Sequence, residues 1–314
     1  MSLRHARPLN GNVLQLPQGP PYSCEELRDW AGVAFDLPAG DPRLLEIHRG
    51  ELTKEGPLDN LVGAVRYWET NPEWMAFLEP SSPAYRDKLI ERGLYLDLWE
   101  SHIPPKSRVL DLGGGVGRFT QWLLDRGCDV ELVDPDLRSL WRAVTHAVGR
   151  PGRLDVHWST GERLPPISKV DVVIASEVLC YAEDPRAVLR NVSDVLKPGG
   201  ILLASVEARW GWAMSTDVYP GSIDGFFTGR VHVPGELWVQ TFTEVEFRDL
   251  LSGYEVIDLQ PSHYAFSGPF ELATSQMSID QALTLEQRLR EHAMASRLNR
   301  IWMATVRRPP NNDG

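Results

Sequence analysis

Residues 107–136, SRVLDLGGGVGRFTQWLLDRGCDVELVDPD, decide the fold of this chain. A short apolar run at 108–112 has the length and the β-branching of a buried strand. A glycine-rich turn follows it, and the apolar residues of 119–124 then repeat at helical spacing. Gly127 stands where a helix C-cap is expected, and a second apolar run ends in Asp134. The stretch therefore predicts a strand, a glycine turn, a helix and a second strand with a carboxylate at its tip.

A unit of this kind suits a ligand that contains adenosine. Glycines let the backbone turn sharply and approach a ligand without a Cβ in the way. The N–H groups at the helix start and the partial positive charge there suit a carboxylate or a phosphate. An acid at the end of the neighbouring strand, here Asp134, accepts hydrogen bonds from both hydroxyls of a ribose.

The spacing of the glycines separates two classes of cofactor. The turn consists of an acid followed by glycines at alternate positions: Asp111, Gly113, Gly115 and Gly117. A dinucleotide site needs G-x-G-x-x-G instead, which disfavours an NAD-linked oxidoreductase. With Asp134 closing the second strand, the stretch resembles the first motif of the class I S-adenosylmethionine (SAM)-dependent methyltransferases. A glycine-rich turn in another doubly wound protein is the plainer alternative.

Two later stretches add to this resemblance. Residues 176–185, SEVLCYAEDP, are similar to the fourth-strand motif of the ubiquinone-biosynthesis type and related small-molecule methyltransferases, which carry Glu-His where this chain has Cys180-Tyr181. Residues 196–200, LKPGG, match the family's turn into strand five. The resemblance implies a Rossmann-like α/β fold: a seven-stranded sheet with helices on both faces, its strand seven antiparallel, plus a helical N-terminal extension.

The other apolar runs and the helix signals predict how the chain is divided. Further strands are expected at 153–159, 169–175, 201–206, 254–259 and 300–306. Residues 1–104 have the pattern of a mainly helical extension that adds no strand to the sheet, and residues 105–308 form the SAM-binding domain.

An aromatic-rich stretch at 208–240 follows strand five and shows no regular period. A loop of this length inside a domain is usually functional or disordered, and its aromatic composition argues against disorder. We expect an insertion that acts as a lid or lines the acceptor pocket. The alternative is a patch that packs on the extension or on a second subunit.

By resemblance, the cofactor site is drawn from several parts of the chain. Asp111 orients the amino end of the cofactor, Asp134 takes the ribose hydroxyls, and the backbone at Ser176 faces the methionine part. Thr160 stands where the family usually has an acid beside the adenine, and Glu162 matches a second acid; a solvated loop charge is its alternative. The residues expected to bind SAM are Asp111, Gly113, Gly115, Gly117, Asp134, Thr160, Gly161, Glu162 and Ser176.

The residues do not identify a general base. Tyr181 stands where relatives carry a histidine, but a phenol with a pKa near ~10 is a poor base at neutral pH. Glu207, at the end of strand five, is the second candidate, and the loop histidines His232 and His263 come after it. Five residues of the extension are candidates for contact with cofactor or acceptor, with packing as their alternative: Tyr67, Trp68, Trp74, Tyr85 and Arg86.

Composition limits the partners and the compartment. The net charge of −11 disfavours nucleic acid as the main partner. Three separate cysteines without a C-x-x-C pair indicate a reducing compartment, and no cluster of acids suggests a metal site. No apolar run approaches the ~18 residues of a membrane span, and the first residues lack the apolar core of a signal peptide. We therefore expect a cytoplasmic protein.

These observations predict an enzyme that transfers a methyl group from SAM to an oxygen or nitrogen atom of a small-molecule acceptor, by in-line displacement at the sulfonium methyl. A peptide or protein methyltransferase is one alternative, which an open groove under residues 208–240 would favour. A non-catalytic SAM-binding subunit is another, because a fold does not imply an activity. The acceptor, the attacked atom and the oligomeric state are left open.

Overall fold

The computed structural model describes residues 78–214, 223–231, 239–266, 268–292 and 297–310. The expected extension before residue 78 and parts of the aromatic-rich stretch lie outside these ranges. The candidates Tyr67, Trp68, Trp74 and His232 therefore also lie outside the described residues.

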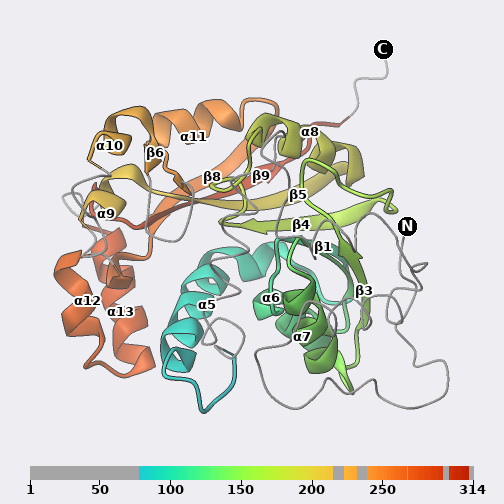
Figure 1. Ribbon diagram of the computed structural model, residues 1–314, viewed down its shortest axis with the longest axis horizontal. Helices are drawn as coiled ribbons and strands as arrows, with labels where there is room; N and C mark the ends of the chain where they lie inside the picture. Colours follow the sequence, from blue (N-terminus) through green and yellow to red (C-terminus); the bar gives the residue numbers. More distant parts are fainter. Residues whose placement is uncertain (1–77, 215–222, 232–238, 267, 293–296, 311–314) are drawn as a thin grey trace, which may run out of the picture.

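A seven-stranded mixed sheet forms the centre of the described chain, with its strands in the order β3-β2-β1-β4-β5-β9-β8 (Figure 1). The strands are β1 (Arg108–Leu112), β2 (Asp129–Asp134), β3 (Arg153–Trp158), β4 (Val170–Ser176), β5 (Leu196–Glu207), β8 (Glu255–Ser262) and β9 (Ile301–Arg307). Strands β1 to β5 run parallel, whereas β9 pairs antiparallel with both β5 and β8. The expected Rossmann-like α/β fold, with its last strand antiparallel, is confirmed.

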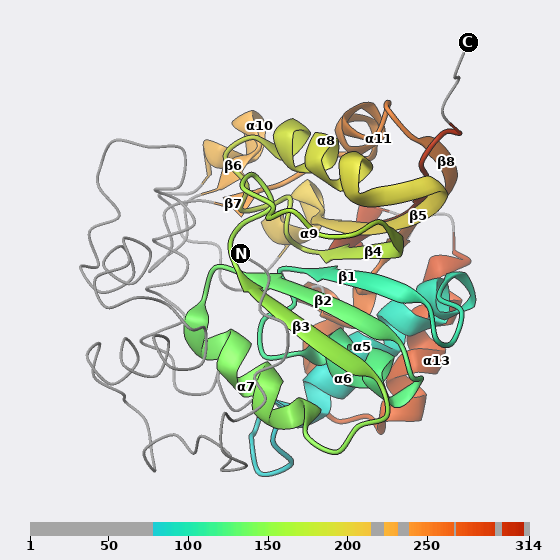
Figure 2. The same cartoon turned by 90° about the vertical axis from the view of Figure 1, so that its right-hand side faces the viewer.

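Helices cover both faces of this sheet (Figures 1 and 2). Along β1, Leu110 and Leu112 join one core cluster and Val109 joins another, because successive side chains of a strand point to opposite faces. The first cluster is completed by α8 (Pro185–Val195) and α11 (Glu244–Leu250), and the second by α5 (Tyr85–Trp99) and α6 (Arg118–Asp125). Helix α7 (Leu137–Ala147) packs beside α6 and against β2 and β3.

Several helix boundaries follow from local side-chain chemistry. The Asp184 carboxylate accepts a hydrogen bond from the Ala187 N–H at 3.0 Å and caps α8, whose first residue is a proline. Thr243 and Glu246 form the reciprocal hydrogen bonds of a capping box at the start of α11, as their spacing predicts. Helix α6 instead begins after Gly117, which has a left-handed φ of 94°.

Helix α5 belongs to the core of the molecule. Its Tyr95 and Trp99 are fully buried, and both rings contact Phe119 of α6, with centroid distances of 5.4 and 6.0 Å. On its other side, α5 lies against α13 (Ile279–Arg290), and the two helices run side by side in Figure 1. The helical character expected for the extension thus holds for the part of it that is described.

Four short elements form in the described parts of the 208–240 stretch, although its sequence shows no period. They are α9 (Arg209–Ala213), α10 (Gly225–Thr228) and the antiparallel pair β6 (Arg230–Val231) and β7 (Val239–Gln240). Two-residue strands are too short to give a periodic signal. Phe226, Val231 and Val239 are buried in the same core cluster as α8.

The other elements of the described ranges are α12 (Gly268–Thr274), the 3₁₀ turns η1 (Glu100–His102) and η3 (Tyr264–Phe266), and loops. No helix within the described ranges has both the length and the apolar character that a membrane crossing requires.

Candidate functional site

The glycine turn between β1 and α6 has a backbone conformation that is strained for any residue with a side chain. Gly113 and Gly115 have φ values of 65° and 55°, in the left-handed region. A Cβ on Gly113 would lie 2.5 Å from the Val178 Cγ2 atom, so the turn also packs closely against the loop after β4. A Cβ on Gly115 would meet no atom within 4 Å.

This turn forms one wall of a cavity at the carboxyl ends of β1, β2 and β4. The cavity encloses about 1070 Å³, counted with the part that opens to solvent. Most of the residues predicted for the site line it: Gly113, Gly115, Asp134, Thr160, Gly161, Glu162, Ser176 and Tyr181. Asp111, Gly117 and Glu207 do not line it, and neither do Tyr85, Arg86 and His263. The sequence motifs thus meet in one place, although Asp111 and the candidate bases Glu207 and His263 lie outside its wall.

Asp134 closes the cavity at the tip of β2. Its carboxylate accepts hydrogen bonds from the backbone N–H groups of Gly115 and Asp136, each at 2.8 Å. Burial, together with the nearby charge of Asp136, raises the pKa of Asp134 to about 7. The carboxylate is therefore held against the turn, at the position where an acid binds a ribose in doubly wound folds.

Asp111 lies beneath the turn. It is almost fully buried and accepts a hydrogen bond of 2.6 Å from the Thr120 hydroxyl of α6. A Cβ on Gly114 would lie 2.6 Å from the Asp111 Oδ2 atom, so this carboxylate supports the turn from below. Burial raises its pKa to about 6. The observed contacts of Asp111 join β1 to α6.

The loop at 160–162 forms the wall that the resemblance assigns to adenine. The Asn191 side chain of α8 donates hydrogen bonds to the carbonyls of Gly161 and Glu162, at 2.9 and 3.0 Å. The Glu162 carboxylate accepts a hydrogen bond of 3.0 Å from the Glu183 N–H, and burial raises its pKa. These contacts give Glu162 a structural partner inside the protein rather than a solvated position.

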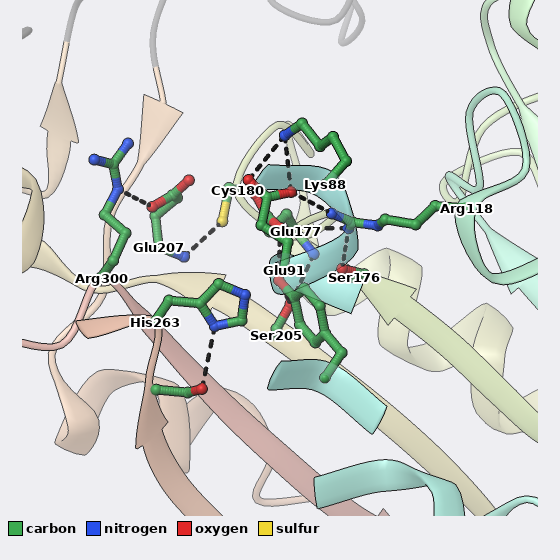
Figure 3. Close-up of polar contacts among 12 residues, drawn as sticks. Lys88, Glu91, Arg118, Ser176, Glu177, Cys180, Ser205, Glu207, His263 and Arg300 are labelled. Atoms are coloured by element: carbon green, nitrogen blue, oxygen red, sulfur yellow. Dashed lines mark hydrogen bonds and ion pairs between the residues drawn. The ribbon is translucent and has the colours of Figure 1, made fainter. Parts of the chain in front are cut away.

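A network of charged residues that the motifs did not predict lies at the β4 end of the cavity (Figure 3). Lys88 of α5, Arg118 of α6 and Glu177 after β4 all line the cavity. The Glu91 carboxylate accepts hydrogen bonds from both cations, Lys88 Nζ and the Arg118 guanidinium, each at 2.8 Å. Arg118 also donates to the Ser176 hydroxyl at 3.0 Å.

The candidate base Glu207 forms a separate cluster. Its carboxylate pairs with Arg300 at 3.0 Å, and the Arg300 guanidinium lies 4.5 Å from the Trp212 ring (Figure 3 shows the ion pair). Burial raises the pKa of Glu207 to about 7. The Cys180 sulfur accepts a hydrogen bond from the Glu207 N–H at 3.0 Å, which ties this cluster to the loop that carries Tyr181.

Two other candidate residues, His263 and Arg86, make contacts away from the cavity wall. His263 is buried, its Nδ1 lies 3.1 Å from the Ser262 hydroxyl, and burial lowers its pKa to about 3, so it is neutral at physiological pH. Arg86 donates hydrogen bonds to the backbone carbonyls of Thr274, the last residue of α12, and of Met277, which precedes α13. Within the described residues, no group of three or more His, Cys, Asp or Glu side chains is arranged to hold a metal ion.

Residues 84–255, more than half of the chain, match a protein family described as a methyltransferase domain. The chain belongs to this family. It is a class I SAM-dependent methyltransferase, as its glycine turn and sheet order indicate, and the cofactor of the family is SAM. This membership rejects the NAD-linked oxidoreductase and the unrelated doubly wound protein as explanations of the glycine turn.

The relatives of this methyltransferase include both uncharacterized methyltransferases and enzymes named for a specific reaction. An uncharacterized methyltransferase of Mycobacterium bovis is 30% identical over 178 residues, which cover 54% of this chain and 70% of the relative. A ubiquinone biosynthesis O-methyltransferase of a Bradyrhizobium strain is 34% identical over 102 residues, which cover 32% of this chain and 40% of that enzyme.

Solved structures show the same fold at low sequence identity. The PH0226 protein of Pyrococcus horikoshii aligns with a TM-score of 0.53 and 16% identity, over 77% of this chain and 98% of that one. A 1,6-didemethyltoxoflavin-N1-methyltransferase of Burkholderia thailandensis, solved with 1,6-didemethyltoxoflavin and S-adenosylhomocysteine (SAH), aligns with a TM-score of 0.50 and 17% identity, over 82% of this chain and 93% of that one.

The residues of the cavity fit this cofactor. The turn leaves space at Gly115, which lines the cavity with Asp134 and has no atom within 4 Å of its missing Cβ. A carboxylate and charged side chains of both signs stand along the same wall, which suits the hydroxyl, ammonium and carboxylate groups of SAM.

Proposed function

We propose that this methyltransferase acts on an oxygen or nitrogen atom of a small-molecule acceptor. The observation that supports the proposal is the cavity itself. The glycine turn, the 160–162 loop and the residues after β4 form its walls, so it is a recess of the kind that binds small ligands rather than a flat surface. A recess of this kind suits a cofactor and a compact acceptor better than an extended polymer.

The cavity wall divides into a cofactor side and an acceptor side. We assign the ribose to Asp134, the adenine to the 160–162 loop, and the methionine part to the Gly113–Gly115 turn and Ser176, as the resemblance implies. Bound SAM supplies an electrophilic methyl group on its sulfonium. The chain's own contribution is to hold the acceptor in line and to exclude water, an effect worth up to ~7–11 kcal/mol of the barrier.

Tyr181 and Val178 form the acceptor side in this proposal. Both line the cavity and follow the end of β4, beyond the glycine turn. The phenol of Tyr181 can donate a hydrogen bond to the acceptor or accept one from it. The apolar Val178, which packs against Gly113, gives an aromatic or aliphatic acceptor a dry surface.

The names of similar proteins fit an oxygen or nitrogen acceptor. A relative is named for O-methylation in ubiquinone biosynthesis, and a structural neighbour is named as an N1-methyltransferase. The neighbour was solved with a small heterocyclic compound and SAH, which agrees with a small molecule as the acceptor here.

The test is a turnover assay on the full chain. Release of SAH is measured with SAM and a panel of phenols, carboxylic acids, amines and heterocycles, and products are identified by mass spectrometry. Methylation of a panel member supports the proposal. Turnover confined to peptides would refute it, and so would SAM binding without turnover on any acceptor, which a non-catalytic subunit predicts. Asp134→Ala serves as the control that should lose both binding and turnover.

We also propose that residues 1–104 form an extension of the 105–308 domain, in which α5 packs into the core and the residues before it cover the acceptor side. The 208–240 stretch is an insertion in this proposal, and the protein works in the cytoplasm. Aromatic residues of the extension are then expected to contact the acceptor. Trp68→Ala and Trp74→Ala should raise the KM for the acceptor and leave SAH affinity unchanged. Equal effects on both ligands would contradict this arrangement.

A further inference from the structure

Two unusual backbone conformations meet at one buried tyrosine. Among the described residues, only Lys106, Glu177 and His263 have a positive φ without being glycine. The Tyr95 hydroxyl donates a hydrogen bond of 2.6 Å to the Glu177 Oε1 atom, and the Tyr95 ring lies 4.5 Å from the ring of His263. Left-handed conformations cost about 1–2 kcal/mol for a residue with a Cβ, and such strain gathers at functional sites.

Glu177 is held at both its backbone and its side chain. Its N–H donates to the Ser205 hydroxyl at 3.0 Å, and the Tyr95 hydroxyl lies 3.2 Å from the same Ser205 oxygen. Tyr95 is fully buried, and its pKa is raised well above the usual range, chiefly by burial, so that it remains a hydrogen-bond donor. The carboxylate therefore has a fixed position set by α5 and β5.

This fixed carboxylate faces the cavity. The Glu177 side chain is 30% exposed and lines the cavity next to Ser176. Its contact with Arg118 is long, at 3.6 Å, because Arg118 pairs more closely with Glu91 at 2.8 Å. Within the described residues, the Glu177 Oε2 atom accepts no hydrogen bond, so one oxygen is fixed and the other is available to a ligand.

Asp111, the acid of the first motif, does not share this exposure. It is 1% exposed, is absent from the cavity wall, and accepts its hydrogen bond from Thr120. The Asp111 carboxylate packs closely against Gly114, because a Cβ on Gly114 would lie 2.6 Å from the Asp111 Oδ2 atom.

We propose that Glu177, held in place by Tyr95, is the carboxylate that binds the α-amino group of the cofactor, and that Asp111 instead supports the turn. Glu177 is thus a binding residue and Tyr95 is a positioning residue. The inference rests on the proposed function, because it concerns the amino-acid end of SAM. It also explains why a strained glutamate stands where the backbone geometry favours glycine or asparagine.

The experiment compares two ligands that differ in this end. SAH carries the amino acid group, whereas 5′-methylthioadenosine lacks it. Calorimetric titration of the full chain gives the ratio of the two dissociation constants. Glu177→Gln should weaken SAH binding about 10-fold, since a charge-assisted hydrogen bond becomes a neutral one, and leave 5′-methylthioadenosine unchanged. Tyr95→Phe should weaken SAH binding by about 2- to 10-fold with the same selectivity.

Two further variants separate positioning from general damage. Tyr254→Phe removes a partly buried hydroxyl that donates to the Leu189 carbonyl at 2.7 Å; neither residue lines the cavity, so both affinities should be unchanged. Asp111→Asn should lower the melting temperature and leave the ratio of the two dissociation constants unchanged.

Three results would overturn the inference. They are unchanged SAH affinity in Glu177→Gln, an equal loss for both ligands in Glu177→Gln or Tyr95→Phe, and a ratio that changes only in Asp111→Asn. A wild-type chain that binds neither ligand would contradict the proposed function itself, so the two failures are distinguishable.

Discussion

Replacement of Gly115 by alanine separates the cost of folding the turn from the cost of filling the cavity. At a φ of 55°, the added Cβ destabilises the fold by about 1–2 kcal/mol. Each kcal/mol lowers the melting temperature by about 2–4 °C for a protein of this size. The Cβ meets no atom within 4 Å, so the new methyl group clashes with no part of the protein and enters the cavity.

The effect on binding follows from the same geometry. An extra carbon in a closely packed site costs about 1–3 kcal/mol, which corresponds to SAH binding weakened by about 5- to 150-fold. The assay is calorimetric titration with SAH, together with a thermal melt of the same sample. The matched control is Gly149→Ala, because Gly149 has a φ of 79°, has no atom within 4 Å of its missing Cβ and lies on the surface.

Gly149→Ala should therefore show a similar decrease in melting temperature and retain full SAH affinity. If both variants bind SAH equally well, the cofactor does not approach Gly115 and the assignment of the turn is wrong. If Gly115→Ala loses binding only in proportion to the fraction of unfolded protein, the cofactor is not packed closely against Gly115.

Three further predictions concern buried carboxylates. The pKa of Asp134 is about 7 in the folded protein and about 3.9 in the unfolded chain, so its contribution to stability is present below pH ~4 and is lost as the pH rises through 7. Asp134→Asn should flatten this part of a plot of melting temperature against pH. An unchanged slope would exclude the pKa shift. Gly114→Ala should destabilise the chain more than Gly115→Ala, because its Cβ would lie 2.6 Å from Asp111, and equal melting temperatures would contradict this. Arg300→Met should cost about 3–5 kcal/mol by leaving Glu207 unpaired, and a second change, Glu207→Gln, should recover most of it in urea unfolding.

The sheet was predictable because its signals are local. Strands buried on both faces are near-continuous apolar runs, as at 170–176, and glycine turns and caps lie within a few residues of the elements that they end. The grouping of Gly113, Asp134 and Thr160 along one cavity has the same origin, since each lies at or just after the end of β1, β2 or β3. Short helices and two-residue strands inside 208–240 have no such periodic signal.

The charged network was not predictable, because its members are distant in the sequence. Tyr95 and Glu177 are 82 positions apart, and no spacing rule shows that α5 crosses the end of β4. The same limit applies to His263, a lone histidine that folding buries behind the ring of Tyr95. The motif also does not show that Asp111 is buried away from the cavity wall.

The place of β9 in the sheet affects how this protein is made. β9 lies between β5 and β8, and its residues Ile301–Arg307 are synthesised after both neighbours. Until β9 leaves the ribosome, β5 and β8 each present an open edge with unpaired N–H and C=O groups, a template for wrong pairing between nascent chains. Chaperone demand during translation should therefore be concentrated in that interval, and a premature stop before Ile301 should yield insoluble chains rather than a smaller working enzyme.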